Sequence, residues 1–169
     1  MPTRQLEVSI PAAKVSLPGT LTLPDNPLGV VAFAHGSGSS RHSPRNRYVA
    51  EVLHEHRIAT LLFDLLTARE DQTYETRFDI ALLTERLLAA LAWLASNEET
   101  KRMNIGCFGA STGAAAALQA AAKHSGARAR SHVRMLAMNA PDPAPGSTSA
   151  NSAGFPRRSQ HSRTWRAQR

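Results

Sequence analysis

A serine stands where a short apolar strand is expected to turn into an alanine-rich helix. Residues 109–113 read Gly-Ala-Ser-Thr-Gly, and this Gly-x-Ser-x-Gly spacing predicts a nucleophile elbow with Ser111 at its tip. Gly109 and Gly113 would leave room for the strained backbone that lifts a serine hydroxyl into open space, and the helix N-terminus would supply oriented N–H dipoles. The chemistry indicated is nucleophilic attack by Ser111. The alternative is an ordinary helix N-cap, a position that serine favours.

A second segment, upstream of the elbow, could stabilise the negative charge that such an attack creates. An apolar run is followed by residues 35–40, which read His-Gly-Ser-Gly-Ser-Ser. A tetrahedral intermediate needs two N–H donors for its oxyanion. We expect one from Thr112, the residue after the nucleophile, and the other from Ser37, in the loop that follows the third strand.

The same loop could instead cradle a phosphate, because it is rich in backbone N–H groups. However, no Gly-Lys-Ser or Gly-Lys-Thr follows it, so it is not a P-loop. Arg41 stands where a dinucleotide fingerprint would need its third glycine. These departures favour the oxyanion loop.

Three pieces of sequence together resemble an α/β-hydrolase of the dienelactone hydrolase family. They are the loop at residues 35–41, the strand end at residues 62–67 (Leu-Phe-Asp-Leu-Leu-Thr) and the elbow at residues 108–113. The resemblance covers residues 1–126 and implies hydrolysis of small esters or lactones without a metal or cofactor. Namesake members use a cysteine nucleophile, whereas the branch that this chain resembles carries serine.

The family resemblance also implies a catalytic Asp and then a His, after two strands that follow the elbow helix. The sequence departs from the family at this point, so the acid and the base of the triad are not assigned. A full-length relative would cleave a small ester, lactone or thioester through an acyl-enzyme. Turnover by this chain is a separate question, and the competing interpretation is a non-catalytic hydrolase remnant.

The chain changes character near residue 127. Residues 1–126 hold 12 Lys and Arg against 12 Asp and Glu, whereas residues 127–169 hold eight arginines, no lysine and one acid, Asp142. The whole net charge of +7 therefore lies in a Pro-, Ser- and Arg-rich segment whose composition predicts disorder. We interpret this segment as a false C-terminus, such as a frameshift product, attached to an interrupted hydrolase domain. The alternative is a genuine basic arm that binds nucleic acid or another acidic partner weakly. The frameshift interpretation is favoured because the segment lacks aromatic residues interleaved with its arginines and lacks a recognisable nucleic-acid motif.

Length and composition bound the remaining possibilities. A chain of 169 residues is expected to form one domain. Its single cysteine excludes an internal disulfide, and the N-terminus lacks the apolar core of a secretory signal. The apolar run at residues 87–95 is too short to span a bilayer. We therefore expect a cytoplasmic protein without membrane, metal or cofactor partners, whose oligomeric state the sequence does not determine.

Alternating strand and helix patterns predict an α/β fold: a mostly parallel sheet with helices on both faces, preceded by an antiparallel hairpin. The expected strands are residues 5–10, 14–23, 29–35, 58–65 and 103–108. The expected helices are a first one capped by Ser43, with Tyr48, Val49, Val52 and Leu53 on its buried face, then residues 77–95 and 112–124. Residues 67–76 read as a polar loop. Without later strands, Ile105 and Phe108 should lie on an exposed edge strand, which is an aggregation hazard, unless residues 133–138 cover that edge.

The other polar candidates have plainer interpretations. Asp64 is expected to fix a loop by accepting backbone N–H bonds, and His35 to be structural. His54 and His56 do not share a helix face, so a metal site is not expected there. Cys107 should be a buried core thiol. The basic stretch of Arg41, His42, Arg45 and Arg47 reads as a solvated face, with an anionic substrate as the alternative. His124 suits a helix C-terminus, and a triad built from His132, Asp142 or His161 is not expected.

Overall fold

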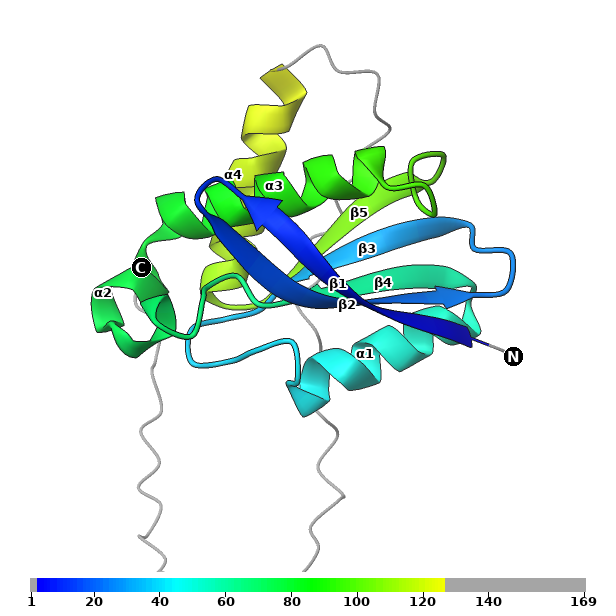
Figure 1. Cartoon of the computed structure of the whole chain (residues 1–169), viewed down its shortest axis with the longest axis horizontal. Helices are drawn as coiled ribbons and strands as arrows, with labels where there is room; N and C mark the ends of the chain where they lie inside the picture. The colour runs from blue at the N-terminus through cyan, green and yellow to red at the C-terminus, as the bar shows by residue number, and fades with distance from the viewer. Residues whose placement is uncertain (1–2, 127–169) are drawn as a thin grey trace, which may run out of the picture.

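The structure is a computed structural model that describes residues 3–126 and contains a five-stranded sheet flanked by helices (Figure 1). The strands are β1 (Thr3–Ala12), β2 (Val15–Pro24), β3 (Gly29–Ala34), β4 (Ile58–Phe63) and β5 (Asn104–Gly109). The helices are α1 (Pro44–Glu55), α2 (Tyr74–Phe78), α3 (Ile80–Ser96) and α4 (Thr112–Gly126), with a 3-10 turn, η1 (Glu70–Gln72). The predicted α/β architecture is confirmed.

The strand order β1-β2-β4-β3-β5 determines where the loops meet. β1 and β2 form an antiparallel hairpin, and β2 pairs antiparallel with β4. β3 pairs parallel with both β4 and β5. Because the carboxyl ends of parallel strands lie at the same edge of a sheet, the loops after β3, β4 and β5 gather there, as ligand-binding loops do in open α/β sheets.

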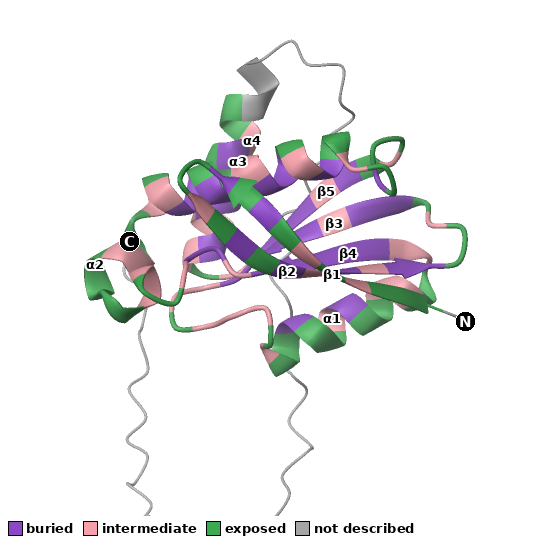
Figure 2. Cartoon of the chain, viewed as in Figure 1, coloured by how far each residue is buried: buried purple, intermediate pink, exposed green. Residues whose placement is uncertain are grey.

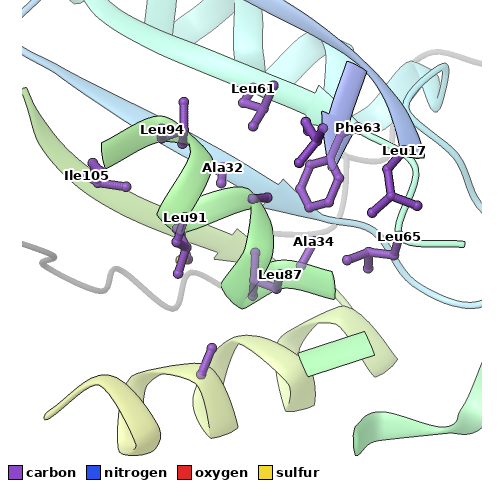
Figure 3. Packing of buried hydrophobic residues seen from close by; sticks show 14 of the residues in the cluster. Leu17, Ala32, Ala34, Leu61, Phe63, Leu65, Leu87, Leu91, Leu94 and Ile105 are labelled. Carbon is purple, nitrogen blue, oxygen red and sulfur yellow. The ribbon is translucent and has the colours of Figure 1, made fainter. Parts of the chain in front are cut away.

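The core lies mainly on the face of the sheet covered by α3 and α4, while α1 covers the other face (Figures 1 and 2). The spacing of apolar residues in the sequence places five of them on one stripe of α3: Ile80, Leu83, Leu87, Leu91 and Leu94. The four leucines are buried, and Ile80 is only partly so. Figure 3 shows its leucines pointing toward sheet side chains from several strands: Ala32, Leu61, Phe63 and Ile105. Burial of this stripe, more than helix propensity, holds α3 in place.

The predicted buried face of α1 is partly wrong. Tyr48 is 68 % exposed and Val52 is also exposed, whereas Val49 and Leu53 pack beside Ala50 against the sheet. The buried stripe runs through Asn46, Ala50 and Leu53, and a stripe at this spacing turns positions 48 and 52 toward solvent. The predicted start is confirmed, since the Ser43 hydroxyl accepts the Asn46 N–H at 3.5 Å and Pro44 is the first helical residue.

The segment after β4 is more ordered than the predicted polar loop. It contains η1 and α2, and the expected single helix at residues 77–95 is broken at Asp79. The Asp79 side chain accepts the Leu82 N–H at 3.0 Å and so caps a new helix, α3. Aspartate competes for backbone N–H groups in this way, which explains the break that apolar periodicity alone does not reveal.

Strand β5 is an edge strand among the described residues, since it pairs only with β3. This is the expected edge position, although the side chains of the strand are buried: Ile105 is 4 % and Phe108 is 6 % exposed. Helices cover both faces of the strand, with Ile105 in the larger core cluster and Phe108 in the cluster beneath α1. Residues 133–138, proposed to cover this edge, and the predicted basic tail at 127–169 lie outside the described range.

No helix within residues 3–126 is both long and apolar enough to cross a membrane.

Candidate functional site

The turn between β5 and α4 has the backbone strain expected of an elbow. Ser111 is exposed and adopts a φ of +54°, a left-handed conformation that costs a residue with a side chain about 1–2 kcal/mol. Hydrogen bonds hold it there: the Gly113 N–H donates to the Ala110 carbonyl at 3.0 Å, and the Ala114 N–H donates to the Ser111 carbonyl at 3.0 Å. Ser111 thus stands at the N-cap position of α4, but without the extended backbone usual for a cap.

Three glycines leave the space that this turn needs. A Cβ on Gly113 would lie 2.0 Å from the Ala34 carbonyl oxygen, and one on Gly109 would lie 2.5 Å from the Gly113 oxygen. A Cβ on Gly36 would lie 3.0 Å from the Ser111 Cβ. The elbow therefore packs directly on the end of β3 and on the loop that follows it.

The two residues expected to supply oxyanion donors are brought together. The Ser37 N–H donates to the Thr112 Oγ1 at 2.9 Å, although 75 positions separate the residues. Thr112 is the first residue of α4, and N–H groups in the first turn have no intrahelical acceptor. The loop after β3 and the N-terminus of α4 thus meet beside Ser111, but the Ser37 N–H is directed at a side-chain oxygen.

His35 joins this loop to the end of β4. Its Nε2 lies 3.0 Å from the Leu65 N–H, and its Nδ1 lies 3.0 Å from the Gly36 carbonyl oxygen. A backbone N–H can only donate, so Nε2 accepts and Nδ1 carries the proton. The buried ring is thus neutral, uses both nitrogens on backbone groups and has the structural contacts expected of it.

Asp64 has the contacts expected of a loop-fixing carboxylate. Its Oδ1 accepts the backbone N–H of Arg41 at 2.8 Å, and its Oδ2 accepts from the Arg41 guanidinium at 3.1 Å. Both side chains are about four-fifths buried. The pair ties the end of β4 to the loop after β3, so the charge of Arg41 is already partly compensated.

The η1–α2 segment packs over the same loops. Asp71 and Arg77 of this segment line a cavity together with Ser37 and Thr112, and its volume of only about 10 Å³ is the size of one water at most. A larger cavity of about 200 Å³ lies on the side of Ser39, Ser40 and Asp64. Asp71 and Arg77 form an ion pair at 3.2 Å. This segment therefore shapes the surroundings of the candidate site.

The sequence analysis did not predict that Arg86 anchors the η1–α2 segment through Glu70. Arg86, buried on α3, donates to the Ala12 carbonyl at 2.6 Å and to Glu70 at 2.8 Å, while the other oxygen of Glu70 accepts the Thr67 N–H at 2.8 Å. Burial by itself would raise the pKa of Glu70, but these bonds and the charge of Arg86 outweigh it, so the pKa is lowered. The one sign of this anchor in the sequence is a charged residue at position 86, beside the apolar stripe of α3.

Cys107 is buried in β5, as predicted, and burial raises the pKa of its thiol to about 12.

At pH 8 we expect a disulfide reagent to modify the native chain very slowly and the urea-unfolded chain rapidly, because the thiolate is the reactive form. Since unfolding restores the ordinary pKa of 9.0, stability should also fall as the pH rises above about 9. Rapid modification of the native chain at pH 8 would contradict this burial.

The rings of His54 and His56 are engaged elsewhere. The Nε2 of His54 lies 2.7 Å from the Thr60 hydroxyl, and the Nδ1 of His56 lies 2.9 Å from the Val52 carbonyl. Burial lowers the pKa of His54, opposed only in part by Glu51. No group of three or more His, Cys, Asp or Glu that could hold a metal occurs in the part of the chain that the structure describes.

Several candidates fall outside what the structure describes. They are the side chain of His124 and the whole of His132, Asp142 and His161. Within the basic stretch, Arg41 is paired with Asp64, Arg45 is also engaged, and His42 and Arg47 are exposed. His42 and Arg47 fit the solvated-face interpretation, whereas Arg41 is largely buried and its charge is paired with Asp64.

Comparison with known proteins gives two kinds of relative. No family model matches the sequence. Proteins of two Mycobacterium tuberculosis strains, CDC 1551 / Oshkosh and ATCC 25618 / H37Rv, are 56 % identical over 121 residues. Both are named "Putative phosphoribosyl transferase"; the match covers 72 % of this chain and 27 % of theirs. The chain thus spans about a quarter of the length of these relatives.

Among solved structures, a dienelactone hydrolase from Anabaena variabilis is 48 % identical, with a TM-score of 0.72. The match covers 78 % of this chain and 61 % of that one. An esterase from Pyrococcus furiosus is 25 % identical, with a TM-score of 0.54, over 69 % of this chain and 45 % of its own. These neighbours confirm the fold and the resemblance noted in the sequence, and they support a hydrolase.

Proposed function

We propose that this chain, which has the α/β-hydrolase fold and resembles dienelactone hydrolase, is the nucleophile-bearing part of a serine hydrolase for small esters or lactones. The observation that carries the proposal is the exposed Ser111 at a φ of +54°, seated against Gly36 at the carboxyl ends of the parallel strands. A strained, exposed serine at a strand-to-helix turn is suited to attack, whereas a helix cap needs no such strain.

The proposed chemistry begins with Ser111 Oγ attacking the carbonyl carbon of the substrate. The new Oγ–C bond forms as the carbonyl π electrons move to oxygen, and the serine proton passes to a general base. Collapse of the intermediate breaks the C–O bond to the alcohol, which takes up that proton. Water then releases the acid from the acyl-enzyme, so the reaction needs no redox or group-carrying cofactor.

The base is not assigned to a residue in the described range. The ring nitrogens of His35 bond backbone groups, and His54 and His56 bond Thr60 and Val52. The proposal therefore separates the reactivity of Ser111 from full turnover, which requires a base and its orienting acid. We do not extend phosphoribosyl transfer to this chain, because the matched segment is about a quarter of those relatives.

The test is covalent labelling by an aryl alkylphosphonate, which forms an Oγ–P bond and releases the aryl alcohol. We expect one label per chain, located on Ser111 by peptide mass analysis, and no label on Ser111→Ala. The control is Ser9→Ala, which removes an exposed hydroxyl of the β1–β2 hairpin and should label like the wild type. A label on another residue, or an unlabelled native wild-type chain, would overturn the proposal.

A further inference from the structure

We propose that the side-chain hydroxyl of Thr112 is itself an oxyanion donor and that the Ser37 N–H acts by orienting it. The inference rests on the proposed function of Ser111. Its starting point is the 2.9 Å hydrogen bond in which the Ser37 N–H donates to Thr112 Oγ1. The sequence pattern predicted a Ser37 N–H that is free to bind the oxyanion. In the structure this N–H is already engaged by Thr112 Oγ1.

The hydroxyl of Thr112 retains a proton to give. A hydroxyl oxygen that accepts an N–H still has its own O–H to donate. Within a helix that proton often goes back to the carbonyl four positions earlier. Thr112 is the first residue of α4, so the residue four positions earlier, Phe108, belongs to β5 and offers no helical carbonyl. The usual internal acceptor is therefore missing.

Two physical effects favour this hydroxyl as a donor. Accepting an N–H polarises the hydroxyl, so its own O–H becomes a stronger donor. Threonine is also branched at Cβ and stiff about χ1, so one bond from Ser37 is enough to orient the oxygen. The backbone N–H and hydroxyl of Thr112 would then flank the oxygen of a group bound to Ser111, which is the arrangement that stabilises developing charge.

A competing possibility makes the opposite prediction. The Thr112 hydroxyl could occupy the place of the oxyanion in the resting chain and rotate away when substrate binds. The Ser37 N–H would then be a direct donor, and removing the hydroxyl would free it. Loss of the hydroxyl would leave the reactivity of Ser111 unchanged or increase it, whereas our proposal requires a decrease.

The experiment compares the rate at which an uncharged aryl alkylphosphonate labels Ser111 in wild type, Thr112→Val and Thr112→Ser. The phosphoryl oxygen of the reagent stands in for the oxyanion. We expect Thr112→Val, which keeps the shape but lacks the hydroxyl, to react roughly 10²–10³-fold more slowly. Thr112→Ser, which retains the hydroxyl, should stay within about tenfold of wild type.

Folding is checked by urea unfolding of each variant, and Thr112→Ala provides a second hydroxyl-free variant should the valine protein fail to fold. A hydroxyl-free variant that folds and labels as fast as wild type would overturn this inference while leaving the role of Ser111 intact. If the native wild-type chain is not labelled at Ser111, both proposals fail.

Discussion

Replacement of Gly113 by alanine is expected to destabilise the folded chain by about 4 kcal/mol or more, a cost seen only when a substitution disrupts tight packing. The added Cβ would lie 2.0 Å from the Ala34 carbonyl oxygen and 2.6 Å from the His35 carbonyl oxygen. These are backbone atoms at the end of β3, held in the sheet by β4 and β5. Because they cannot move aside as a flexible side chain would, the turn or the strand must shift.

Urea unfolding followed by circular dichroism measures this loss, and Gly38→Ala is the matched control. Nothing lies within 4 Å of a Cβ at Gly38, but its φ is +69°. That substitution should cost only the about 1–2 kcal/mol of a left-handed alanine. Equal unfolding midpoints for wild type and Gly113→Ala would show that α4 does not sit against β3 as described.

Truncation of Leu87 to alanine is the second large effect, with an expected loss of about 2–5 kcal/mol in unfolding free energy. Leu87 is 0 % exposed and lies at the centre of the α3 stripe, against the core of the sheet (Figure 3). The loss has two parts: the transfer free energy of the deleted methyl groups and the cavity that remains, because the surrounding strands and α4 relax only in part.

Leu118→Ala is the matched control, since this leucine on α4 is 60 % exposed. The same chemical change there should alter stability by about 0.5 kcal/mol or less. The difference between the two urea midpoints isolates the contribution of burial. Equal losses at both positions would mean either that α3 is not packed as described or that another part of the chain covers Leu118.

Gly113 and Leu87 show how the fold supports the candidate functional site. Gly113 allows α4 to begin against the end of β3, and the α3 stripe holds the sheet whose loops converge there. Arg86 links α3 to the segment over the site through Glu70, and Asp64 links β4 to the loop after β3 through Arg41. The strain at Ser111 persists because these neighbours determine its position from several sides.

The sequence alone determined the succession of strands and helices along the chain, the position of the elbow and the fold class. Local patterns carry this information: alternation and apolar runs predict strands, a stripe of leucines predicts α3, and Gly-x-Ser-x-Gly predicts a turn that only glycines permit. The resemblance to dienelactone hydrolase also followed from short motifs. The tertiary structure left these elements in place, moved their ends, broke one helix at Asp79, and placed η1 and α2 where a polar loop was expected.

Only the tertiary structure decided which faces are buried and which polar groups meet. Tyr48 and Val52 are large apolar side chains like Val49 and Leu53, so the local sequence does not reveal that α1 turns the first two toward solvent. The packing of Ala50 against the sheet determines which of them are exposed. Ser37 and Thr112 are 75 positions apart, and their hydrogen bond exists because β3 and β5 are adjacent in the sheet. Contacts between distant segments depend on sheet order, and a single sequence records that order only indirectly.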